Sequence, residues 1–443
     1  MSNEHHVMDI PGYYYDAEKK KYFKVMATGR YSRENYEKSQ NQPVTSPPPP
    51  KKRRVTSLPV YRSIRETQSL GASKKDASTV YMGLLTRLGK PQKISMLGMA
   101  ALTATATARP TALDVHPKHN HLLLGLADGC VAQTLFSMNR TNGYQQHALT
   151  LTMHGSDLTS IRMGLDDRCV ITTMGNGLVP PTMSFLKLDL HAQHKDDDQH
   201  LMPPAALHTF SHTKLGSFWS CDRSRLNPSS TILGTDSDVL YFSGTDVHTK
   251  FKIKSATLAA QIDPVQPNVF LCGGRDGHIR LYDVRQDRRS VDYYRGHGAC
   301  TMKHKSAITH LHKSGSSFHV VAASMDGSLQ TWDLRGQTTH PNGRPWPIFR
   351  FHGHKNSHSR SLGFDVLDAA NIVALAGEDH VIRLWSLKGD SPHPFHTISM
   401  KSAIPALKFC ASNPKLPIPD RSLGLLACID EKETPLQWLS VLG

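Results

Sequence analysis

The chain has 443 residues, a formal net charge of +15 and 26 histidines. This length accommodates one large repeat domain and a tail, and the absence of any run of eighteen apolar residues excludes a predicted membrane helix. The polar N-terminus predicts no secretory signal. Seven single cysteines, none in a Cys-x-x-Cys pair, indicate reduced thiols rather than a disulfide framework or a zinc site.

The first 79 residues predict a basic, mostly disordered tail, because they are rich in Lys, Ser, Pro, Gln and Asn and poor in branched aliphatic residues. Residues 1–80 hold 15 Lys and Arg against 8 Asp and Glu, a net charge of +7. Such a charge suits nucleic acid or an acidic protein partner. No recognisable nucleic-acid-binding motif accompanies it, so we do not expect direct binding of nucleic acid.

One aromatic motif, residues 11–25 (PGYYYDAEKKKYFKV), interrupts this tail. Its two aromatic segments flank a polar turn, which predicts a small β-hairpin. A lone hairpin is marginally stable in water, so this one would dock on the surface of the same chain or on a partner. The alternative is an adhesive segment without structure.

A basic run, residues 51–55, follows four consecutive prolines that favour an extended, exposed backbone. Its four cations, Lys51, Lys52, Arg53 and Arg54, resemble a short nuclear import signal that enters an acidic receptor groove. The sequence therefore predicts a protein of the nucleus, with the cytoplasm as a second location. A solvated charge run without a receptor is the alternative.

Replacement of these four cations by Ala should move a fluorescent fusion of the full chain toward the cytoplasm, because the receptor groove would lose its ligand. The nuclear fraction measured by microscopy tests this. A nuclear fraction equal to that of the unchanged fusion would refute the prediction.

From residue 80 to residue 443 the sequence predicts a ring of similar units. An alternating segment at 102–108 (LTATATA) could pair with the last unit and leave no free sheet edge at the seam. The expected units are residues 111–138, 159–188 and 218–243, three units that contain the repeats described next, and residues 403–441.

Two copies of one pattern, about fifty residues apart, define these units. They are FLCGGRDGHIRLYDVR at 270–285 and VVAASMDGSLQTWDLR at 320–335, and a weaker copy lies at 372–388. Each has an apolar run, small residues, a turn Asp and an alternating strand; the first two turns read Asp-Gly. Aromatic-Asp at a strand end with this period is typical of WD repeats, so the predicted fold is an all-β, seven-bladed β-propeller.

A network of buried polar groups should stabilise the blades. A histidine that precedes a WD repeat commonly bonds the turn aspartate of its blade, where the two groups satisfy each other. We therefore expect His297 to pair with Asp326, in the blade of Trp332, and His354 to pair with Asp379. These residues are predicted to be structural rather than catalytic.

Motifs for catalysis and metal binding are absent from the sequence. The histidine groups 116, 119, 121 and 352, 354, 358 have no matching cysteine or carboxylate spacing. A phosphate-binding glycine loop, a Gly-x-Ser-x-Gly elbow and a His-Glu-x-x-His motif are also missing. We expect no catalytic residue, no metal, no cofactor and no enzymatic activity.

The two tandem boxes that end in aromatic-Asp-x-Arg resemble those of WD-repeat substrate receptors of cullin-4 RING ubiquitin ligases, and residues 11–25 resemble the opening of one member of that family. This resemblance implies that Arg285 and Arg335, beside Asp283 and Asp333, contact a multi-propeller adaptor and, through it, the cullin. A guanidinium at a strand end can offer planar donors to such a partner. Both boxes depart from the family pattern. Tyr282 replaces Trp in the first box, and Gln330 and Thr331 replace a basic and an aliphatic residue in the second.

The resemblance thus implies a non-catalytic substrate receptor that brings an unidentified protein to the ligase. The rival interpretation is a WD-repeat scaffold in a nuclear ribonucleoprotein or chromatin complex. In that case both arginines would only complete ordinary blades.

Overall fold

The computed structural model describes a large part of the chain. The described residues are 13–16, 21–24, 81–88, 92–97, 109–119, 121–135, 145–152, 155–188, 205–285, 300–315, 317–335, 346–411, 423–430 and 436–440. The basic run 51–55 and the predicted domain boundary at residue 80 lie outside them, so both stay predictions.

The chain divides into two compact units, residues 1–58 and 59–443. In the first unit, β1 (Tyr13–Asp16) and β2 (Lys21–Lys24) form an antiparallel hairpin in which Tyr13 lies opposite Lys24. The predicted hairpin in the aromatic motif is therefore present.

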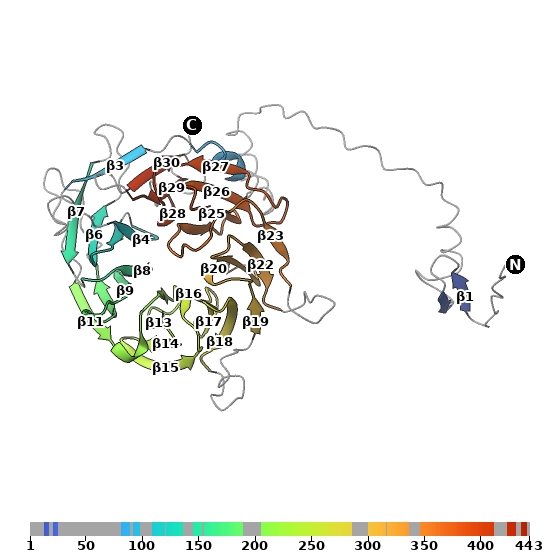
Figure 1. The fold of residues 1–443 in the computed structure, drawn as a ribbon, viewed down its shortest axis with the longest axis horizontal. Helices are drawn as coiled ribbons and strands as arrows, with labels where there is room; N and C mark the ends of the chain where they lie inside the picture. The colour runs from blue at the N-terminus through green and yellow to red at the C-terminus, as the bar shows by residue number, and fades with distance from the viewer. Residues whose placement is uncertain are drawn as a thin grey trace. The chain divides into compact units, whose positions relative to one another are not determined.

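The second unit is a seven-bladed β-propeller, which confirms the predicted fold (Figure 1). In each blade the first strand lies nearest the centre and the last lies at the rim.

Blade 1 consists of β4 (Pro110–Val115), β5 (His121–Leu126), β6 (Cys130–Leu135) and β7 (Gln145–Thr152). Blade 2 consists of β8 (Leu158–Met163), β9 (Arg168–Thr173), β10 (Thr182–Lys187) and β11 (Ala205–Ser211). Blade 3 follows the short 3-10 helix η1 (Thr213–Leu215) and consists of β12 (Ser220–Arg223), β13 (Ser230–Gly234), β14 (Asp238–Ser243) and β15 (Asp246–Lys252).

The three repeats found in the sequence lie in the next three blades. Blade 4 consists of β16 (Thr257–Ile262), β17 (Val269–Gly274), β18 (His278–Asp283) and β19 (Cys300–Lys303). Blade 5 consists of β20 (Ile308–Lys313), β21 (His319–Ser324), β22 (Leu329–Asp333) and β23 (Phe349–Phe351). Blade 6 consists of β24 (Phe364–Leu367), β25 (Ile372–Ala376), β26 (Val381–Ser386) and β27 (His396–Ser399).

Blade 7 closes the ring with a strand from the other end of the sequence. It combines β28 (Ala406–Ala411), β29 (Leu423–Cys428) and β30 (Leu436–Ser440) with β3 (Gln92–Leu97). Strand β3 pairs antiparallel with β30 through residues 92–94 and parallel with β7 of blade 1 through residues 95–97. Closure by an N-terminal segment is thus as predicted, but the strand was placed wrongly. It lies ahead of the predicted 102–108, a segment outside the described residues.

Apolar second strands hold the blades together. Strands β5, β17, β25 and β29 are buried at every position, because each is sandwiched between neighbouring blades. Between blades 5 and 6, for example, Val321 and Leu329 share one cluster with Val373 and Trp385. Each such fully buried side chain stabilises the fold by about 1.5–3 kcal/mol.

Two glycines of the first repeat are required by this packing. A Cβ on Gly273 would lie 2.4 Å from Cγ2 of Ile308 in the next blade, so only glycine allows this approach. Gly277 has φ of +78° in the turn after β17, a conformation that disfavours other residues.

Residues 81–85 form a short helical segment. Tyr81, Leu85 and the following Leu88 pack into the apolar cluster of blades 6 and 7. No helix in the described part of the chain is long and apolar enough to cross a membrane.

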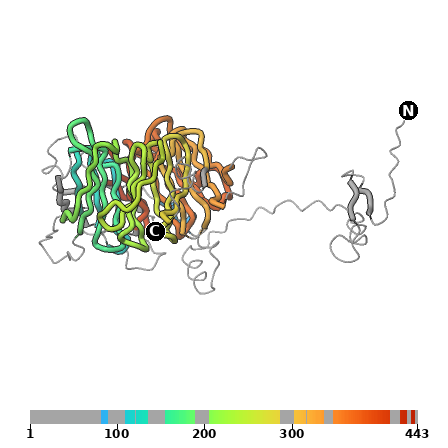
Figure 2. Tube along the Cα trace, turned by 90° about the horizontal axis from the view of Figure 1, so that it is seen from below, coloured from blue at the N-terminus to red at the C-terminus, as the bar shows by residue number. Residues whose placement is uncertain are grey.

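The propeller has two distinct faces, which Figure 2 shows from the side. Because the strands of a blade are antiparallel, the start of the first strand and the turn between the second and third lie on one face, here called the turn face. The loop between the first and second strands and the end of the third strand lie on the other, here called the box face.

Candidate functional site

The two Asp-x-Arg boxes lie on the box face of adjacent blades. Strand β18 of blade 4 ends at Asp283 and β22 of blade 5 ends at Asp333, and each arginine follows two residues later. The side chains of Arg285 and Arg335 are 65% and 56% exposed. Both guanidinium groups are therefore on the surface and are not part of the apolar core.

Each arginine is held by the aspartate of its own box. Asp283 accepts hydrogen bonds from the backbone nitrogen of Arg285 at 2.9 Å, from its Nε at 2.9 Å and from Nη2 at 2.6 Å. Asp333 binds Arg335 in the same way, with Nη2 at 2.7 Å. Hydrogen bonding from the arginine holds the pKa of each carboxyl below its usual range. The two aspartates thus fix the direction of the arginines.

Apolar side chains extend the surface between the boxes. Phe318 is 59% exposed, and Cζ of Arg335 lies 5.2 Å from its ring centroid. The backbone of Leu334 donates to the carbonyl of Phe318 at 3.0 Å, which ties this loop to the second box. Val265, 53% exposed, lies in the matching loop of blade 4. We refer to Arg285, Arg335, Val265 and Phe318 as the box surface.

The buried polar network of blade 5 uses a histidine that differs from the predicted one. Nε1 of Trp332 donates to Nε2 of His304 at 2.8 Å, and Nδ1 of His304 lies 3.3 Å from Oγ of Ser324. Ser324 in turn donates to Asp326 at 2.7 Å. Asp326 and Trp332 both belong to this network, in which His304 makes the bond to Trp332. His297 lies outside the described residues, so its pairing with Asp326 stays a prediction.

The predicted pair in blade 6 is wrong. Asp379 binds both terminal nitrogens of Arg383, at 2.5 and 2.9 Å, while Nδ1 of His354 is buried without a partner. The physical reason is the residue two before the turn aspartate. Blade 5 has Ser324 there, whose hydroxyl links His to Asp, whereas blade 6 has Gly377. A Cβ at Gly377 would lie 2.4 Å from Oδ1 of Asp379, so glycine leaves the aspartate to the arginine.

Blade 4 follows the arrangement of blade 6. Asp276 binds Arg280 at 2.5 and 3.2 Å, and Gly274 stands at the position of Ser324. An arginine four residues after the turn aspartate, together with this glycine, is the sequence signal that distinguishes the two kinds of blade.

The buried His304 predicts a stability that depends on pH. Burial lowers the pKa of His304 to about 4, although Asp326 opposes this. An unfolded histidine titrates near 6.5, so the unfolded chain takes up a proton that the folded chain resists. Above pH 6.5, His304 should not reduce the free energy of unfolding. As the pH falls toward 4 that free energy should decrease, and His304 alone should lower it by about 2 kcal/mol between pH 7 and pH 5.

His304→Gln is the matched variant for this prediction, because an amide can accept from Trp332 and donate to Ser324 without titrating. Urea unfolding at pH 7 and pH 5 should show a smaller pH dependence for the variant than for the unchanged protein. Equal pH dependence in the two proteins would contradict the assignment.

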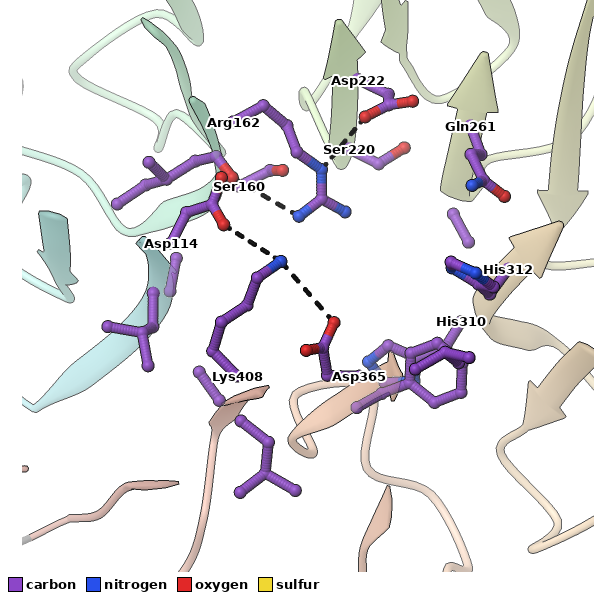
Figure 3. Close-up of a pocket in the computed structure, with 18 of the residues that line it drawn as sticks. Asp114, Ser160, Arg162, Ser220, Asp222, Gln261, His310, His312, Asp365 and Lys408 are labelled. Atoms are coloured by element: carbon purple, nitrogen blue, oxygen red, sulfur yellow. Dashed lines mark hydrogen bonds and ion pairs between the residues drawn. The ribbon is translucent and has the colours of Figure 1, made fainter. Parts of the chain in front are cut away.

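A ring of polar side chains, here called the axial ring, lines the channel at the centre of the propeller (Figure 3). The channel contains a cavity of about 640 Å³. Each innermost strand contributes one member, in blade order Asp114, Arg162, Asp222, Gln261, His312, Asp365 and Lys408.

Ion pairs link members of the axial ring. Nζ of Lys408 lies 3.1 Å from Asp114 and 3.6 Å from Asp365, and Nε of Arg162 lies 3.3 Å from Asp222. Burial alone would raise the pKa of Asp114, but Lys408, Arg162 and a backbone N–H outweigh it and hold that pKa below its usual value. Burial wins at Asp222, whose pKa is raised.

Four members of the axial ring also bond the backbone of the next blade. The backbone nitrogen of Met163 donates to Asp114 at 2.8 Å, and that of Ile262 donates to Asp222 at 2.8 Å. In the same way, the backbone nitrogen of Lys313 donates to Gln261 at 2.6 Å and that of Phe409 donates to Asp365 at 2.7 Å. The ring therefore holds neighbouring blades in register, and its polar groups are largely satisfied by the protein itself.

One of the histidines considered for metal binding, His116, bonds the backbone of its own loop and of blade 2. Nε2 of His116 lies 3.0 Å from the carbonyl oxygen of Asp166, and its Nδ1 accepts from the backbone of Lys118 and His119. Within the described ranges, no group of three or more His, Cys, Asp or Glu could hold a metal ion.

These features define a WD-repeat β-propeller that presents two arginine boxes on one face. The sequence profile of the DDB1- and CUL4-associated factor 4 beta-propeller domain matches residues 160–428, more than half of the chain. The chain belongs to this family of propellers.

Individual relatives are distant. The DDB1- and CUL4-associated factor 4 of Bos taurus is 26% identical over 254 residues, which cover 55% of this chain and 47% of the relative. The human DDB1- and CUL4-associated factor 4-like protein 2 is 28% identical over 166 residues, covering 36% and 38%. The E3 ubiquitin-protein ligase COP1 of Pisum sativum is 26% identical over 191 residues, covering 42% and 26%. The chain spans less than half of the length of each of these curated relatives.

Proposed function

We propose that this protein is a non-catalytic substrate receptor of a cullin-4 RING ubiquitin ligase, and that its box surface binds the multi-propeller adaptor that connects receptors to the cullin. The observation that carries the proposal is the pair of exposed arginines, each fixed by an aspartate, on one face of adjacent blades. The names of the DDB1- and CUL4-associated relatives support the same assignment.

The geometry of the boxes suits protein binding. Asp283 engages Nε and Nη2 of Arg285, which form one edge of the guanidinium, so the other edge can donate to a partner. Because the pairing with aspartate already fixes the side chain, less conformational entropy is lost when a partner binds. Phe318 and Val265 add apolar contact area beside the charges.

Affinity purification of the tagged full chain, followed by mass spectrometry, tests the proposal. We expect recovery of the adaptor and the cullin, and direct binding of the purified adaptor to the purified chain. The purified chain alone should transfer no ubiquitin. Recovery of RNA-processing or histone proteins without the adaptor would favour the rival function, a nuclear scaffold.

A further inference from the structure

The turn face carries a second arginine cluster, built around one tryptophan. Trp219 precedes β12 of blade 3, and Cζ of Arg275 and of Arg360 lie 5.4 and 4.7 Å from its ring centroid. Nε1 of Trp219 donates to Asp236 at 2.6 Å, and Asp236 also accepts from the backbone of Ser217. The indole is therefore fixed as a platform for the two cations.

Arg360 lies across the mouth of the axial channel. It precedes β24 of blade 6, yet it contacts Trp219 of blade 3, and its Nη2 lies 3.6 Å from the sulfur of Met174 in blade 2. Trp219 and Arg360 both line the channel, while Arg275 lies in the turn between β17 and β18. Three separate blades thus bring the cluster together on the turn face.

Neither arginine of this cluster has a carboxylate partner. In the ranges that the structure describes, no acidic oxygen lies within ion-pair distance of Arg275 or Arg360. Burial, together with the nearby Arg275 and Arg109, lowers the pKa of Arg360, and Asp157 offsets this only in part. A partly buried guanidinium that has a thioether but no carboxylate as acceptor is costly, so this position favours an anionic ligand.

The other end of the channel shows the opposite arrangement. On the box face, Lys313 pairs with Asp263 at 3.0 Å and Arg223 pairs with Asp166 at 2.6 Å. The cations at that end are neutralised within the protein. Arg275 and Arg360, on the turn face, differ from these cations because neither has an ion-pair partner among the described residues.

An apolar floor adjoins the cations. Trp219 and Met325 pack against Ala256, Leu258 and Ala307, which are buried. A ligand for this surface must therefore combine negative charge with an apolar group, and a polypeptide can supply both from neighbouring side chains.

We propose that the mouth of the channel on the turn face binds a short acidic segment of another polypeptide, with carboxylates paired to Arg275 and Arg360 and a neighbouring apolar side chain against Trp219. In the ligase function proposed above, on which this step rests, that polypeptide is the substrate. The box surface and the substrate site would then lie on opposite faces, so adaptor and substrate could bind together.

A randomised library of 12-residue peptides displayed on phage, panned against the purified full chain, tests the proposal. We expect the selected peptides to be enriched in Asp and Glu relative to the input. A selected peptide, made synthetically with a fluorescein label, should bind about 30-fold or more weakly to Arg275→Ala/Arg360→Ala, as for loss of an interface hot spot. Its affinity should also fall with added salt.

Three comparisons sharpen this test. The exposed Arg275→Ala alone should weaken binding without affecting the fold, and the Arg275→Lys/Arg360→Lys variant should recover part of the affinity. The variant Arg285→Ala/Arg335→Ala, on the box face, should bind the peptide as well as the unchanged chain. A version of the peptide with Gln in place of Glu should bind poorly.

Several results would overturn the inference. Selected peptides without acidic residues, or acidic peptides that bind the Arg275→Ala/Arg360→Ala variant equally well, would do so. A labelled single-stranded RNA of twelve nucleotides that binds more tightly than any peptide, through the same arginines, would assign the site to RNA instead. Peptide binding without adaptor recovery would refute the ligase function alone, and adaptor recovery without peptide binding would refute this site alone.

Discussion

The double variant Arg285→Ala/Arg335→Ala should lose the adaptor and keep its fold. An interface arginine that is a hot spot contributes about 2 kcal/mol or more, so two of them should weaken binding several hundredfold if their effects add. Both side chains are more than half exposed, so the melting temperature should stay close to that of the unchanged chain. Binding of the purified adaptor, measured by titration alongside thermal melting, gives both quantities.

The controls for this variant follow from the two faces. Arg275→Ala changes one exposed arginine on the turn face and should leave adaptor affinity unchanged. Arg285→Lys/Arg335→Lys keeps the charges but not the planar donors, so it should bind with intermediate affinity. Normal adaptor binding by a folded Arg285→Ala/Arg335→Ala variant would refute the proposed interface and favour the scaffold function.

The blades and the boxes could be predicted because their signals are local. A turn Asp-Gly, an alternating strand and a closing Asp-x-Arg all lie within sixteen residues, and the repeat at 320–335 confirms that at 270–285. The alternating pattern pointed to the wrong closing strand, because LTATATA at 102–108 alternates more clearly than Gln92–Leu97. The pairing of β3 with β30 and β7 depends on how the ring closes, which no local pattern reports.

The blade networks show a different limit. The sequence pointed to His297, which follows Gly296, whereas His304, which follows Lys303, makes the bond to Trp332. In blade 6, Nδ1 of His354 has no partner, because a link to Asp379 needs a hydroxyl that Gly377 does not supply. Which polar groups pair in a blade is thus decided by a neighbour that the WD pattern does not specify.

The axial ring was not predicted at all, since each member is a single polar residue in an otherwise ordinary strand. Asp114 finds its partners on β8 and β28, which are distant in sequence. One signal was available: the first strand of every blade carries at least one Asp, Arg, Gln, His or Lys. That regularity becomes visible only when the blades are aligned by register.

Asp114→Ala should be among the most destabilising single substitutions in the propeller. The carboxylate is 7% exposed and accepts from both Lys408 and the backbone of Met163. Its removal leaves a buried N–H without an acceptor and leaves Lys408 with only Asp365, at 3.6 Å. Breaking a buried pair in this way costs about 3–5 kcal/mol, which urea unfolding can measure.

Two further variants separate the charge from the hydrogen bond. Asp114→Asn retains an oxygen for Met163 and should lose less stability than Asp114→Ala. The double variant Asp114→Ala/Lys408→Met removes both charges of the pair, so its loss should be smaller than the sum of the two single losses. Because the pKa of Asp114 is held below its usual value, the carboxylate should make its full contribution to the free energy of unfolding near neutral pH. That contribution should disappear as the pH falls through that pKa. A loss below about 1 kcal/mol for Asp114→Ala, or strict additivity in the double variant, would mean that the axial ring does not hold the blades together.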